Sequence, residues 1–504
     1  MIGKLVIRAD ADARIGTGHI MRCLALAQGW QDGGGDVTFV TALKATAIDA
    51  RLQSEGMATV NITAEPGSLD DATQTVDLAH KVQAAWVVAD GYQFAADYQQ
   101  VVKEAGLSLA LIDDYGHASR YVADIVLNQN AYAHEGLYAQ REPYTQLLLG
   151  ARYALLRREF TRWRTWKREI SSVVRRVLVT LGGADPANTT LEVVRALEQA
   201  RVKGLEVAVV VGASYPHFAG LASTLNGSPL SVRLLRNVTD MPELMAWADI
   251  AIAGGGATTW ELAFMGLPSL ILVLADNQRP IAEWLDRQHV AIRLNRREEL
   301  SQEIAQALQQ SLVPDMRVRM SQRGRKIIDG QGCQRVLERL RGLELTLRRA
   351  AWADCKLLWE WANDTETREA SFSSEAIPWE EHIEWFKQRI DDPRCIIYIA
   401  SNSQDVPVGQ VRYETEDTQA VISISLDRRF RNQGYGSLLI KKSSEDVFSA
   451  TNVQTIHAYL RSNNEASARA FVKAGFQPME TKTIKGYQAL RLALSNQKKD
   501  ASPW

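Results

Sequence analysis

Residues 8–23 read RADADARIGTGHIMRC, and this stretch decides the fold that the sequence predicts. It follows an apolar run typical of a strand, crosses a loop that holds Gly16 and Gly18, and enters the apolar helical pattern MRCLALAQGW. In such a unit, loop amides and the positive end of the helix can face an anion. His19 stands at the helix start, where the dipole disfavours imidazolium, so we expect a neutral histidine able to accept a proton. A histidine there can also be a capping or packing residue.

Composition indicates an ordinary globular protein of several domains. The 504 residues are too many for one hydrophobic core, and usual domain sizes predict about three domains. With 58 basic and 59 acidic residues, no overall field would recruit nucleic acid or anionic lipid. The four cysteines are widely spaced, which predicts a reduced chain without structural zinc. No apolar run approaches about 18 residues and the chain begins with a strand pattern, so we expect a cytoplasmic protein without a membrane partner.

The first part of the chain alternates strand and helix patterns. Apolar runs occur in VTFVTA (37–42), WVVADGY (86–92), LALIDDYG (109–116) and DIVLNQN (124–130). This spacing predicts a parallel, doubly wound sheet, whose ligands bind beyond the carboxyl ends of the strands. The polar residues at these ends predict a shared site: Asp10, Asp12, Asp90, Tyr92, Asp113, Asp114 and Tyr115. Any one of the aspartates can instead be a helix cap or a turn former.

A second α/β part repeats this pattern. RRVLVTLGGADPANTT (175–190) is again a strand, a glycine turn and a helix, and ADIAIAGGGATTWELAFMGLPSLILV (248–273) holds a strand ending in three glycines. Those glycines, 254–256, let the backbone approach a phosphate, and the hydroxyls of Thr258 and Thr259 can donate to it. Glu261, one turn into the helix, is placed to accept hydrogen bonds from ribose. The pattern predicts a nucleotide-binding half.

In this order, RADADARIGTGHIMRCLALA, LGGADPAN, GGGATTWE and DNQ closely resemble the nucleotide-sugar hydrolases of pseudaminic acid biosynthesis, from residue 1 to about residue 343. The resemblance implies two Rossmann-like doubly wound domains in the GT-B arrangement, residues 1–160 and 161–343. It implies that UDP is removed from UDP-2,4-diacetamido-2,4,6-trideoxy-β-L-altropyranose, with His19 as the base that activates water. It also implies a substrate- and UDP-binding set, which comprises Asp12, Gly16, Gly18, Arg22, Tyr92, Gly254, Gly255, Gly256, Ala257, Thr258, Thr259, Glu261 and Asn277.

That reaction agrees with these residue types. Breaking an anomeric bond to UDP needs a water aimed at C1, a base for its proton and stabilisation of the diphosphate charge. UDP is a good leaving group, so a separate general acid is not required, and a single attack by water inverts C1. Amides at two helix N-termini can hold the diphosphate, and we expect no metal.

The last part of the chain, residues 344–495, resembles the GNAT acetyltransferases, which implies an α+β domain with a mixed central sheet. RNQGYG (431–436) has the R/Q-x-x-G-x-G/A form of their CoA pyrophosphate loop, and TIHAYLRSNNEASARAFVKAGFQP (455–478) matches their later signature. IPWEEHIEWF (377–386) also resembles the acetyltransferase of the same pathway. Acetyl-CoA is the implied co-substrate, and the residues expected to bind it are Leu426, Arg431, Asn432, Gln433, Gly434, Tyr435, Gly436, Asn464 and Ser467.

One departure concerns the general acid of this domain. Many GNAT enzymes carry a tyrosine four residues after the serine, and this chain has Phe471 there. Tyr435, Tyr459, Tyr487 or water are the alternatives, and a thiol pKa near about 8.5 makes the departure of thiolate easy. His382 either faces the sugar or is an ordinary helix-surface residue, and we favour the surface position slightly.

Together the resemblances imply a bifunctional enzyme. The C-terminal domain would acetylate the 4-amine of UDP-4-amino-4,6-dideoxy-N-acetyl-β-L-altrosamine, and the N-terminal domains would then hydrolyse the product. The alternatives are a GT-B glycosyltransferase, or a hydrolase of another UDP-amino sugar, fused to an acetyltransferase, and a non-catalytic nucleotide-sugar sensor. Neither sugar stereochemistry nor oligomeric state follows from the sequence.

Overall fold

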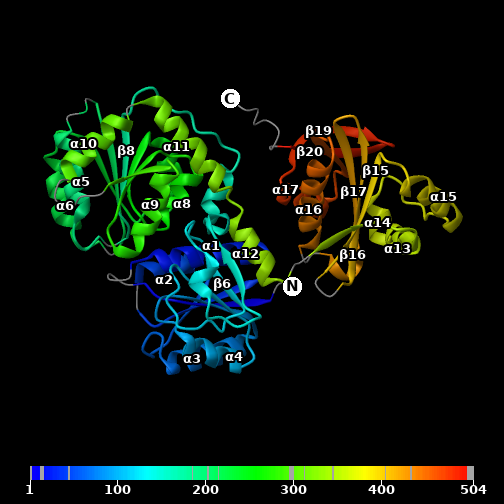
Figure 1. Cartoon of the computed structure of the whole chain (residues 1–504), viewed down its shortest axis with the longest axis horizontal. Coiled ribbons are helices and arrows are strands. Elements are labelled where there is room, and N and C mark those ends of the chain that lie inside the picture. The colour runs from blue at the N-terminus through cyan, green and yellow to red at the C-terminus, as the bar shows by residue number, and fades with distance from the viewer. Residues whose placement is uncertain are drawn as a thin grey trace. The chain divides into compact units, whose positions relative to one another are not determined.

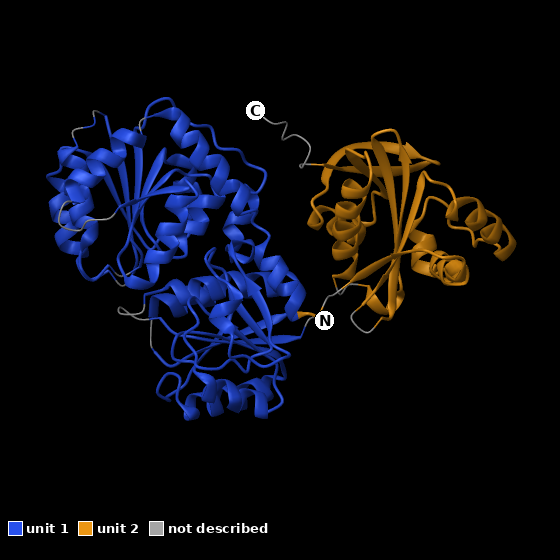
Figure 2. Ribbon diagram, viewed as in Figure 1, with its two compact units in different colours: residues 1–340 blue, residues 341–504 orange. Residues whose placement is uncertain are grey.

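The computed structural model describes residues 3–11, 16–43, 46–183, 185–200, 202, 204–213, 215–294, 300–311, 313–342, 345–402, 405–431 and 434–496. The chain forms two compact units, residues 1–340 (unit 1) and 341–504 (unit 2), shown in Figure 2. Each unit has hydrophobic cores of its own.

The first sheet of unit 1 is parallel throughout, with the strand order β3-β2-β1-β4-β5-β6-β7 (Figure 1). Its strands are β1 (Lys4–Ala9), β2 (Asp36–Thr41), β3 (Ala58–Asn61), β4 (Ala84–Asp90), β5 (Leu109–Ile112), β6 (Ile125–Asn128) and β7 (Gln146–Leu149). The helices that accompany them are α1 (Gly18–Asp32), α2 (Thr46–Ser54), α3 (Leu69–Val82) and α4 (Ala96–Glu104).

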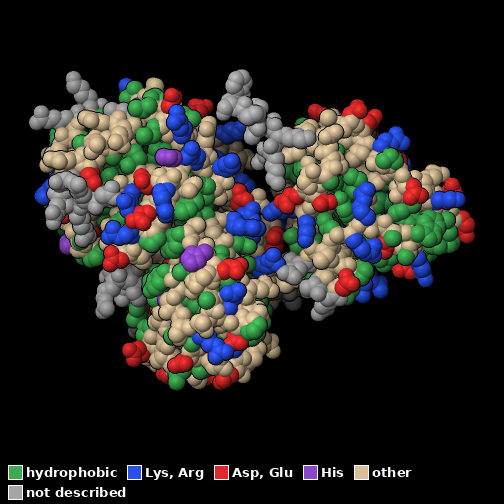
Figure 3. Space-filling model, viewed as in Figure 1, with side chains coloured by type: hydrophobic (Ala, Val, Ile, Leu, Met, Phe, Trp, Pro, Cys, Tyr) green, Lys and Arg blue, Asp and Glu red, His purple; other side chains and the backbone are tan. Residues whose placement is uncertain are grey.

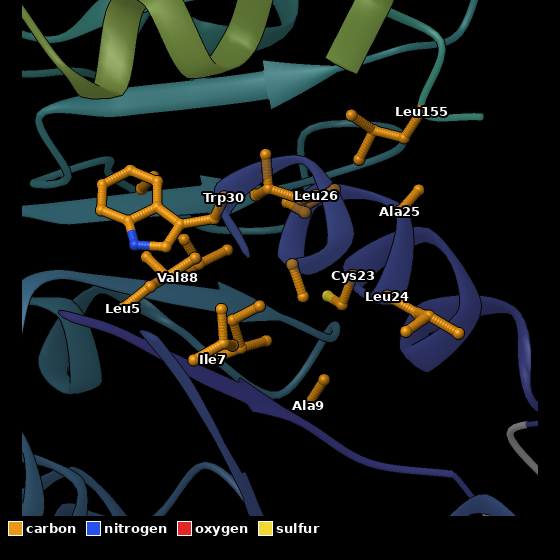
Figure 4. Packing of buried hydrophobic residues seen from close by; sticks show 14 of the residues in the cluster. Leu5, Ile7, Ala9, Cys23, Leu24, Ala25, Leu26, Trp30, Val88 and Leu155 are labelled. Carbon is orange, nitrogen blue, oxygen red and sulfur yellow. The ribbon is translucent and has the colours of Figure 1, made fainter. Parts of the chain in front are cut away.

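Helices cover both faces of this sheet, which explains its continuous apolar strands. Leu5 and Ile7 of β1 pack in one core with Leu26 and Trp30 of α1, as Figure 4 shows. Val6, which points the other way, packs in a second core with side chains of α3 and α4. The alternation follows from the two-residue period of a strand.

The second sheet of unit 1 is also parallel, in the order β10-β9-β8-β11-β12-β13. Its strands are β8 (Arg176–Thr180), β9 (Glu206–Val211), β10 (Ser231–Arg236), β11 (Ile250–Gly254), β12 (Ser269–Leu272) and β13 (Ala291–Leu294). One core joins it to α5 (Thr189–Gln199), α6 (Phe218–Asn226) and α10 (Leu300–Ser311). Another core joins it to α7 (Met241–Trp247), α8 (Thr258–Phe264) and α9 (Arg279–Arg287), and α11 (Pro314–Ile327) lies against α8 and α10.

The last helix of unit 1 returns to the first sheet. α12 (Gly332–Leu340) follows the second sheet in the chain, yet Val336 and Leu337 pack in the core of α1. Gly29 of α1 permits this approach, because a Cβ there would lie 2.7 Å from Leu337 Cδ1 and 2.8 Å from Cys333 Sγ. The chain therefore leaves the first sheet before the second sheet begins, and it returns to the first sheet after the second one ends.

Unit 2 holds a mixed sheet of order β14-β15-β16-β17-β18-β20-β19. Its strands are β14 (Thr346–Arg349), β15 (Cys395–Ser401), β16 (Pro407–Glu416), β17 (Gln419–Leu426), β18 (Thr455–Arg461), β19 (Gln477–Ile484) and β20 (Tyr487–Ser495). β17 and β18 are parallel and the other pairs are antiparallel. The two parallel sheets of unit 1 and this mixed sheet confirm the predicted fold class.

Helices lie on both faces of the unit 2 sheet. Ile396 and Tyr398 of β15 share a core with α16 (Tyr435–Ala450) and α17 (Glu465–Lys473). Ile397 and Ile399, with the opposite orientation, share a core with α13 (Cys355–Ala362) and α15 (Trp379–Ile390). A short helix, α14 (Thr365–Ala370), follows α13.

The surface carries charges of both signs. On the face shown in Figure 3, basic and acidic side chains of unit 1 are interspersed, in line with the net charge of −1. None of the helices that the structure describes combines the length and apolarity needed to cross a bilayer.

Candidate active sites

Unit 1 contains a cavity of about 820 Å³ between its two sheets. Its lining comes from loops that follow the carboxyl ends of strands in both sheets, where doubly wound folds bind ligands. From the first sheet come His19, Tyr92 and Asp114, and from the second come Gly255 and Asn277. The cavity therefore joins the strand-end residues of both halves in one site.

His19 is paired with the carboxylate at the end of β4. Its Nδ1 lies 2.6 Å from Asp90 Oδ1, and the imidazole is largely buried at the wall of the cavity. An ionised carboxylate only accepts hydrogen bonds, so this contact places the ring proton on Nδ1. Nε2 is then the basic nitrogen, and it is the one left for a ligand.

Arg22, one turn later in α1, fixes that carboxylate. Its Nε and Nη2 each donate to Asp90 at 2.7 Å, and its Nη1 donates to Asp114 Oδ1 at 2.7 Å. Burial opposes ionisation of Asp90, but Arg22 and His19 outweigh it and hold the pKa of this carboxyl well below its usual range. Burial and Arg22 act in the same way on Asp114, whose pKa is also lowered. Both aspartates are thus anionic at neutral pH.

Tyr92 and Asn277 bridge the two halves of unit 1. The Tyr92 hydroxyl donates to Asp114 Oδ2 at 2.8 Å and accepts from Asn277 Nδ2 at 3.2 Å. The Tyr92 ring meets the His19 ring edge to face, with centroids 5.1 Å apart. Burial and Asp114 raise the pKa of the phenol well above its ordinary value, so the hydroxyl keeps its proton. Tyr92 therefore contacts His19 from the first sheet and Asn277 from the second.

The triple-glycine loop forms part of the opposite wall. This wall is lined by Gly255, Gly256, Ala257 and Thr258, all of which were predicted to bind UDP. A larger residue at Gly255 would be tightly packed, since a Cβ there would lie 3.0 Å from Gln278 Cβ and 3.2 Å from Gln278 O. The two other predicted members of the loop do not line the cavity: Gly254 ends β11, and Thr259 is buried, with its hydroxyl donating to Gly256 O at 2.7 Å.

Glu261 lines the cavity beside an arginine that the sequence analysis did not single out. Arg157 Nη2 donates to Glu261 Oε1 at 2.9 Å, and Arg157 Nη1 lies 2.8 Å from Glu159. Burial raises the pKa of Glu261, although Arg157 opposes the shift. Both recorded bonds from Arg157 go to Oε1, so Oε2 is the oxygen available to a ribose.

The glycine turns of the two halves approach each other at the cavity. Gly16 and Gly18, both predicted to bind substrate or UDP, line it, and a Cβ on Gly183 would lie 2.8 Å from Thr17 Oγ1. Asp12 lies outside the described residues. Asp185, the aspartate of LGGADPAN, accepts from the amides of Thr189 and Thr190 at 3.0 and 2.8 Å, so its carboxylate caps α5.

Asp90 and Asp114 were predicted to share a site, because the carboxyl ends of neighbouring strands meet at one rim, and Arg22 binds both of them. Arg157 was not predicted as a site residue. No local pattern could reveal it, since it lies between the two sheets in the chain and reaches Glu261 across 104 positions of sequence.

In unit 2 the candidate coenzyme site lies where two strands diverge. β17 and β18 pair only as far as Ile422 and Ala458, although the strands run on to Leu426 and Arg461. The loop after β17 leads to Gly434, which has φ +95° at the start of α16 and so favours glycine. An opening between strands that faces a helix start suits a long ligand with a phosphate at one end.

Several predicted coenzyme ligands are engaged with the protein itself. Arg431 makes ion pairs with Asp364 at 2.6 Å and Glu366 at 2.9 Å, so its guanidinium is directed to α14. Asn464 caps α17 by accepting from the amide of Ser467 at 3.1 Å. Asn432 and Gln433 lie outside the described residues.

The candidate proton donors of unit 2 differ in exposure. Tyr435 is buried, Tyr459 is half-buried, and Tyr487 is 39% exposed. Phe471 is buried against Phe476 in the core. These positions leave the general acid unassigned.

His382 corrects a prediction, because it is not a surface residue. It is 3% exposed, its ring stacks near those of Trp379 and Phe386, and its Nε2 lies 2.9 Å from Cys355 O. Burial lowers the pKa of this imidazole, although the bond to Cys355 opposes the shift. The face of α15 that carries His382 therefore packs on α13.

Within the described parts of the chain, no group of three or more histidine, cysteine, aspartate or glutamate side chains is arranged to hold a metal ion. The structure describes all four cysteines, and none of them forms a disulfide bond.

Known families match two segments of the chain. Residues 176–329 match the Glycosyltransferase family 28 C-terminal domain, and residues 344–477 match the Acetyltransferase (GNAT) domain. The chain thus joins a domain similar to glycosyltransferases and a GNAT-type domain in one polypeptide.

Three curated proteins show similarity over longer stretches. An uncharacterised protein of Methanocaldococcus jannaschii is 23% identical over 96% of this chain and 98% of its own length. The UDP-2,4-diacetamido-2,4,6-trideoxy-β-L-altropyranose hydrolase of Campylobacter jejuni is 23% identical over 56% of this chain and 97% of its own length. The spore coat polysaccharide biosynthesis protein SpsG of Bacillus subtilis is 26% identical over 49% of this chain and 72% of its own length.

Two solved structures are similar to parts of the chain. MurG of Acinetobacter baumannii is 15% identical, covers 67% of this chain and 99% of its own, and gives a TM-score of 0.47. Spermidine N-acetyltransferase of Vibrio cholerae, in complex with CoA and spermine, is 18% identical, covers 31% of this chain and 96% of its own, and gives a TM-score of 0.29.

Proposed function

We propose that this chain is a bifunctional enzyme that acetylates the amine of a UDP-amino sugar in unit 2 and hydrolyses the acetylated UDP-sugar in unit 1. The observation that carries the hydrolase assignment is the pair of His19 and Asp90, 2.6 Å apart at the wall of the cavity. The similarity to the hydrolase of Campylobacter jejuni and the match to the GNAT family support the two activities.

His19 supplies the base for hydrolysis. Its Nε2 takes a proton from water as the water oxygen attacks C1 of the sugar, and the bond from C1 to the diphosphate oxygen breaks. The electron pair of that bond leaves with UDP. Asp90 stays ionised and stabilises the imidazolium that forms, because Arg22 has already lowered its pKa. A single displacement of this kind inverts C1.

Different residues of the cavity walls bind different parts of UDP. Backbone of the triple-glycine loop and the hydroxyl of Thr258 approach the diphosphate, and Glu261 accepts from ribose hydroxyls. Arg157 pairs with Glu261 and opposes the rise in its pKa that burial causes. Tyr92 and Asn277, joined across the cavity, contact the sugar or the diphosphate beside His19.

Unit 2 transfers the acetyl group. Gly434 and the start of α16 hold the pyrophosphate of acetyl-CoA, and its pantetheine arm enters between the diverging strands β17 and β18. The amine attacks the acetyl carbonyl carbon, the C–S bond breaks, and the electron pair leaves on the thiolate. A thiol pKa near about 8.5 makes this departure easy without a dedicated acid.

For the substrate we propose UDP-4-amino-4,6-dideoxy-N-acetyl-β-L-altrosamine, which becomes UDP-2,4-diacetamido-2,4,6-trideoxy-β-L-altropyranose and is then hydrolysed. We further propose three functional domains, residues 1–160, 161–343 and 344–495, in a cytoplasmic protein. The similarity to SpsG supports a second candidate, the same two steps on a different UDP-amino sugar.

Mass spectrometry of the purified chain tests the proposal. With the UDP-4-amino sugar and acetyl-CoA, we expect acetylated UDP-sugar followed by free UDP, and without acetyl-CoA neither product. Acetylation without release of UDP would instead indicate a glycosyltransferase awaiting its acceptor, which the glycosyltransferase-type match leaves as the alternative. No reaction with this sugar but both steps with another would move the assignment to the second candidate.

A further inference from the structure

One face of the unit 2 sheet carries a cluster of basic side chains that the acetyl transfer described above does not use. Ile456 and Ala458 of β18 point into the core beneath α16, so His457, Tyr459 and Arg461 point to the opposite face. Arg491 of β20 stands opposite Tyr459 in the strand register and shares that face. We call His457, Arg461 and Arg491 the basic cluster.

The basic cluster has buried nitrogen atoms without partners. His457 Nδ1, Arg461 Nε and Nη2, and Arg491 Nε are buried and make no hydrogen bond to any residue that the structure describes. A buried donor without a partner is energetically costly, and native proteins pair most such groups. Four of them on two adjacent strands point to a ligand that accepts hydrogen bonds.

The cluster offers only donors. Arg491 Nη2 lies 3.5 Å from His457 Nε2, and because a guanidinium cannot accept, Nε2 is the acceptor and the proton is on Nδ1. All four unpartnered atoms are therefore N–H groups. The recorded acidic partner is Glu480, 3.3 Å from Arg491 Nη1, and its side chain is 69% exposed. Arg461 lies over the Tyr487 ring at 3.8 Å, which fixes its guanidinium in place.

The position of the basic cluster favours the molecule that receives the acetyl group as its ligand, rather than the coenzyme. Tyr459 and Arg461 belong to the part of β18 that has diverged from β17, next to the opening assigned to the pantetheine arm. The pyrophosphate of the coenzyme is assigned to the start of α16, which packs on the opposite face of the sheet. An anion at the cluster would thus approach the acetyl group from the other side of the sheet.

We propose that His457, Arg461 and Arg491 bind the diphosphate of the nucleotide-linked amine that unit 2 acetylates. The proposal rests on the proposed function, which gives the acceptor its diphosphate. Arg461 offers Nε and Nη2 as a two-pronged donor, Arg491 adds Nε and His457 adds Nδ1, and the two guanidinium charges suit the two negative charges of a diphosphate. Coenzyme A also carries a diphosphate, so the test has to show whether the bound diphosphate belongs to the nucleotide-linked amine or to coenzyme A.

Titration calorimetry of the full chain with UDP tests the site directly. We expect two UDP sites in the unchanged chain, one in unit 1 and one at the basic cluster, and a single site in the double variant Arg461→Gln/Arg491→Gln. Arg469→Gln is the matched control, because Arg469 lies in unit 2 with a side chain 73% exposed. One UDP site in the unchanged chain, or two in the double variant, would overturn the proposal.

Kinetics identify the ligand as acceptor. In the double variant the KM for the UDP-amino sugar should rise at least about tenfold, since two charge-assisted contacts are lost, while the KM for acetyl-CoA stays unchanged. A higher KM for acetyl-CoA with an unchanged KM for the sugar would overturn the proposal in favour of the coenzyme. If the unchanged chain acetylates no UDP-amino sugar, the proposed function fails, and loss of one UDP site in the double variant would still establish the diphosphate site.

Discussion

The two glycine loops that lead into α1 and α16 prepare similar helix starts for different chemistry. At α1, His19 is bound to Asp90, and Asp90 in turn to Arg22, all within 2.7 Å. At α16, the cationic side chain of the loop, Arg431, is directed into α14, and the opening is bounded by backbone and strand edges. A helix start supplies anion binding in both places, but only the first adds a titratable pair aligned for proton transfer.

This comparison implies different ways of catalysis. In the proposed hydrolysis, unit 1 moves a proton from water, and the proposed base is held in one tautomer by a carboxylate that is itself fixed by an arginine. In the proposed acetyl transfer, unit 2 handles an amine and a good leaving group, so holding the two reactants together would contribute most of the rate. Substitutions should therefore affect the two reactions through different kinetic constants.

Removal of the base should have the largest effect. His19→Ala should slow UDP release by about a thousandfold, the usual contribution of a general base, and leave acetyl transfer unchanged. Separate assays of UDP and of acetylated sugar measure both. His80→Ala, at an exposed position of α3, is the control. Equal loss of both reactions in His19→Ala would refute the division between the units.

The stability of unit 1 at acid pH should depend on another buried carboxylate, Asp113. Burial opposes its ionisation, but His117, the Tyr121 hydroxyl and the amide of Gly116 lower its pKa to about 2. Because the folded pKa is below the unfolded value, this stabilisation is present above about pH 4 and is lost as the pH falls toward 2. Asp113→Asn should remove about 2 kcal/mol of that pH dependence.

Urea unfolding followed at several pH values between 2 and 5 measures this effect. Asp97→Asn, at the start of α4, is the control for loss of one acidic group. A slope of unfolding free energy against pH that is the same in Asp113→Asn and in the unchanged chain would contradict the assignment.

The coenzyme loop should respond mainly in binding. Gly434 has φ +95°, and an alanine there is strained by about 1–2 kcal/mol, so Gly434→Ala should raise the KM for acetyl-CoA about tenfold. UDP release from the acetylated sugar should stay unchanged. Gly486→Ala, at φ +83° in the turn between β19 and β20, carries similar strain away from the loop. If the KM for acetyl-CoA is unchanged in Gly434→Ala, the pyrophosphate binds elsewhere.

The contact between Tyr92 and Asn277 should have the smallest effect. It is a neutral hydrogen bond of 3.2 Å, so Tyr92→Phe and Asn277→Ala should each lower kcat/KM for UDP release several-fold. The double variant should lose less than the product of the two single losses, because both remove one contact. Fully multiplicative losses would show that the two residues act independently.

Periodicity and strand-end chemistry made much of the fold and of unit 1's site predictable. His19 and Tyr92 come from segments far apart in the chain, and they meet because parallel strands of the first sheet end at one rim. Asn277 comes from the second sheet, and only the family resemblance implied its place beside Tyr92. Other features depend on contacts that no local pattern encodes. The return of α12 to α1, the bond of Arg157 to Glu261 and the burial of His382 under aromatic rings are of this kind.

The most direct test of the central claim is hydrolysis in ¹⁸O-labelled water, followed by mass spectrometry of the UDP. Water activated by His19 attacks C1, so the bond between C1 and oxygen breaks and UDP retains its original oxygens. We predict unlabelled UDP in the unchanged chain and little UDP at all in His19→Ala. UDP that carries ¹⁸O would show that water attacks phosphorus, and it would contradict the role assigned to His19.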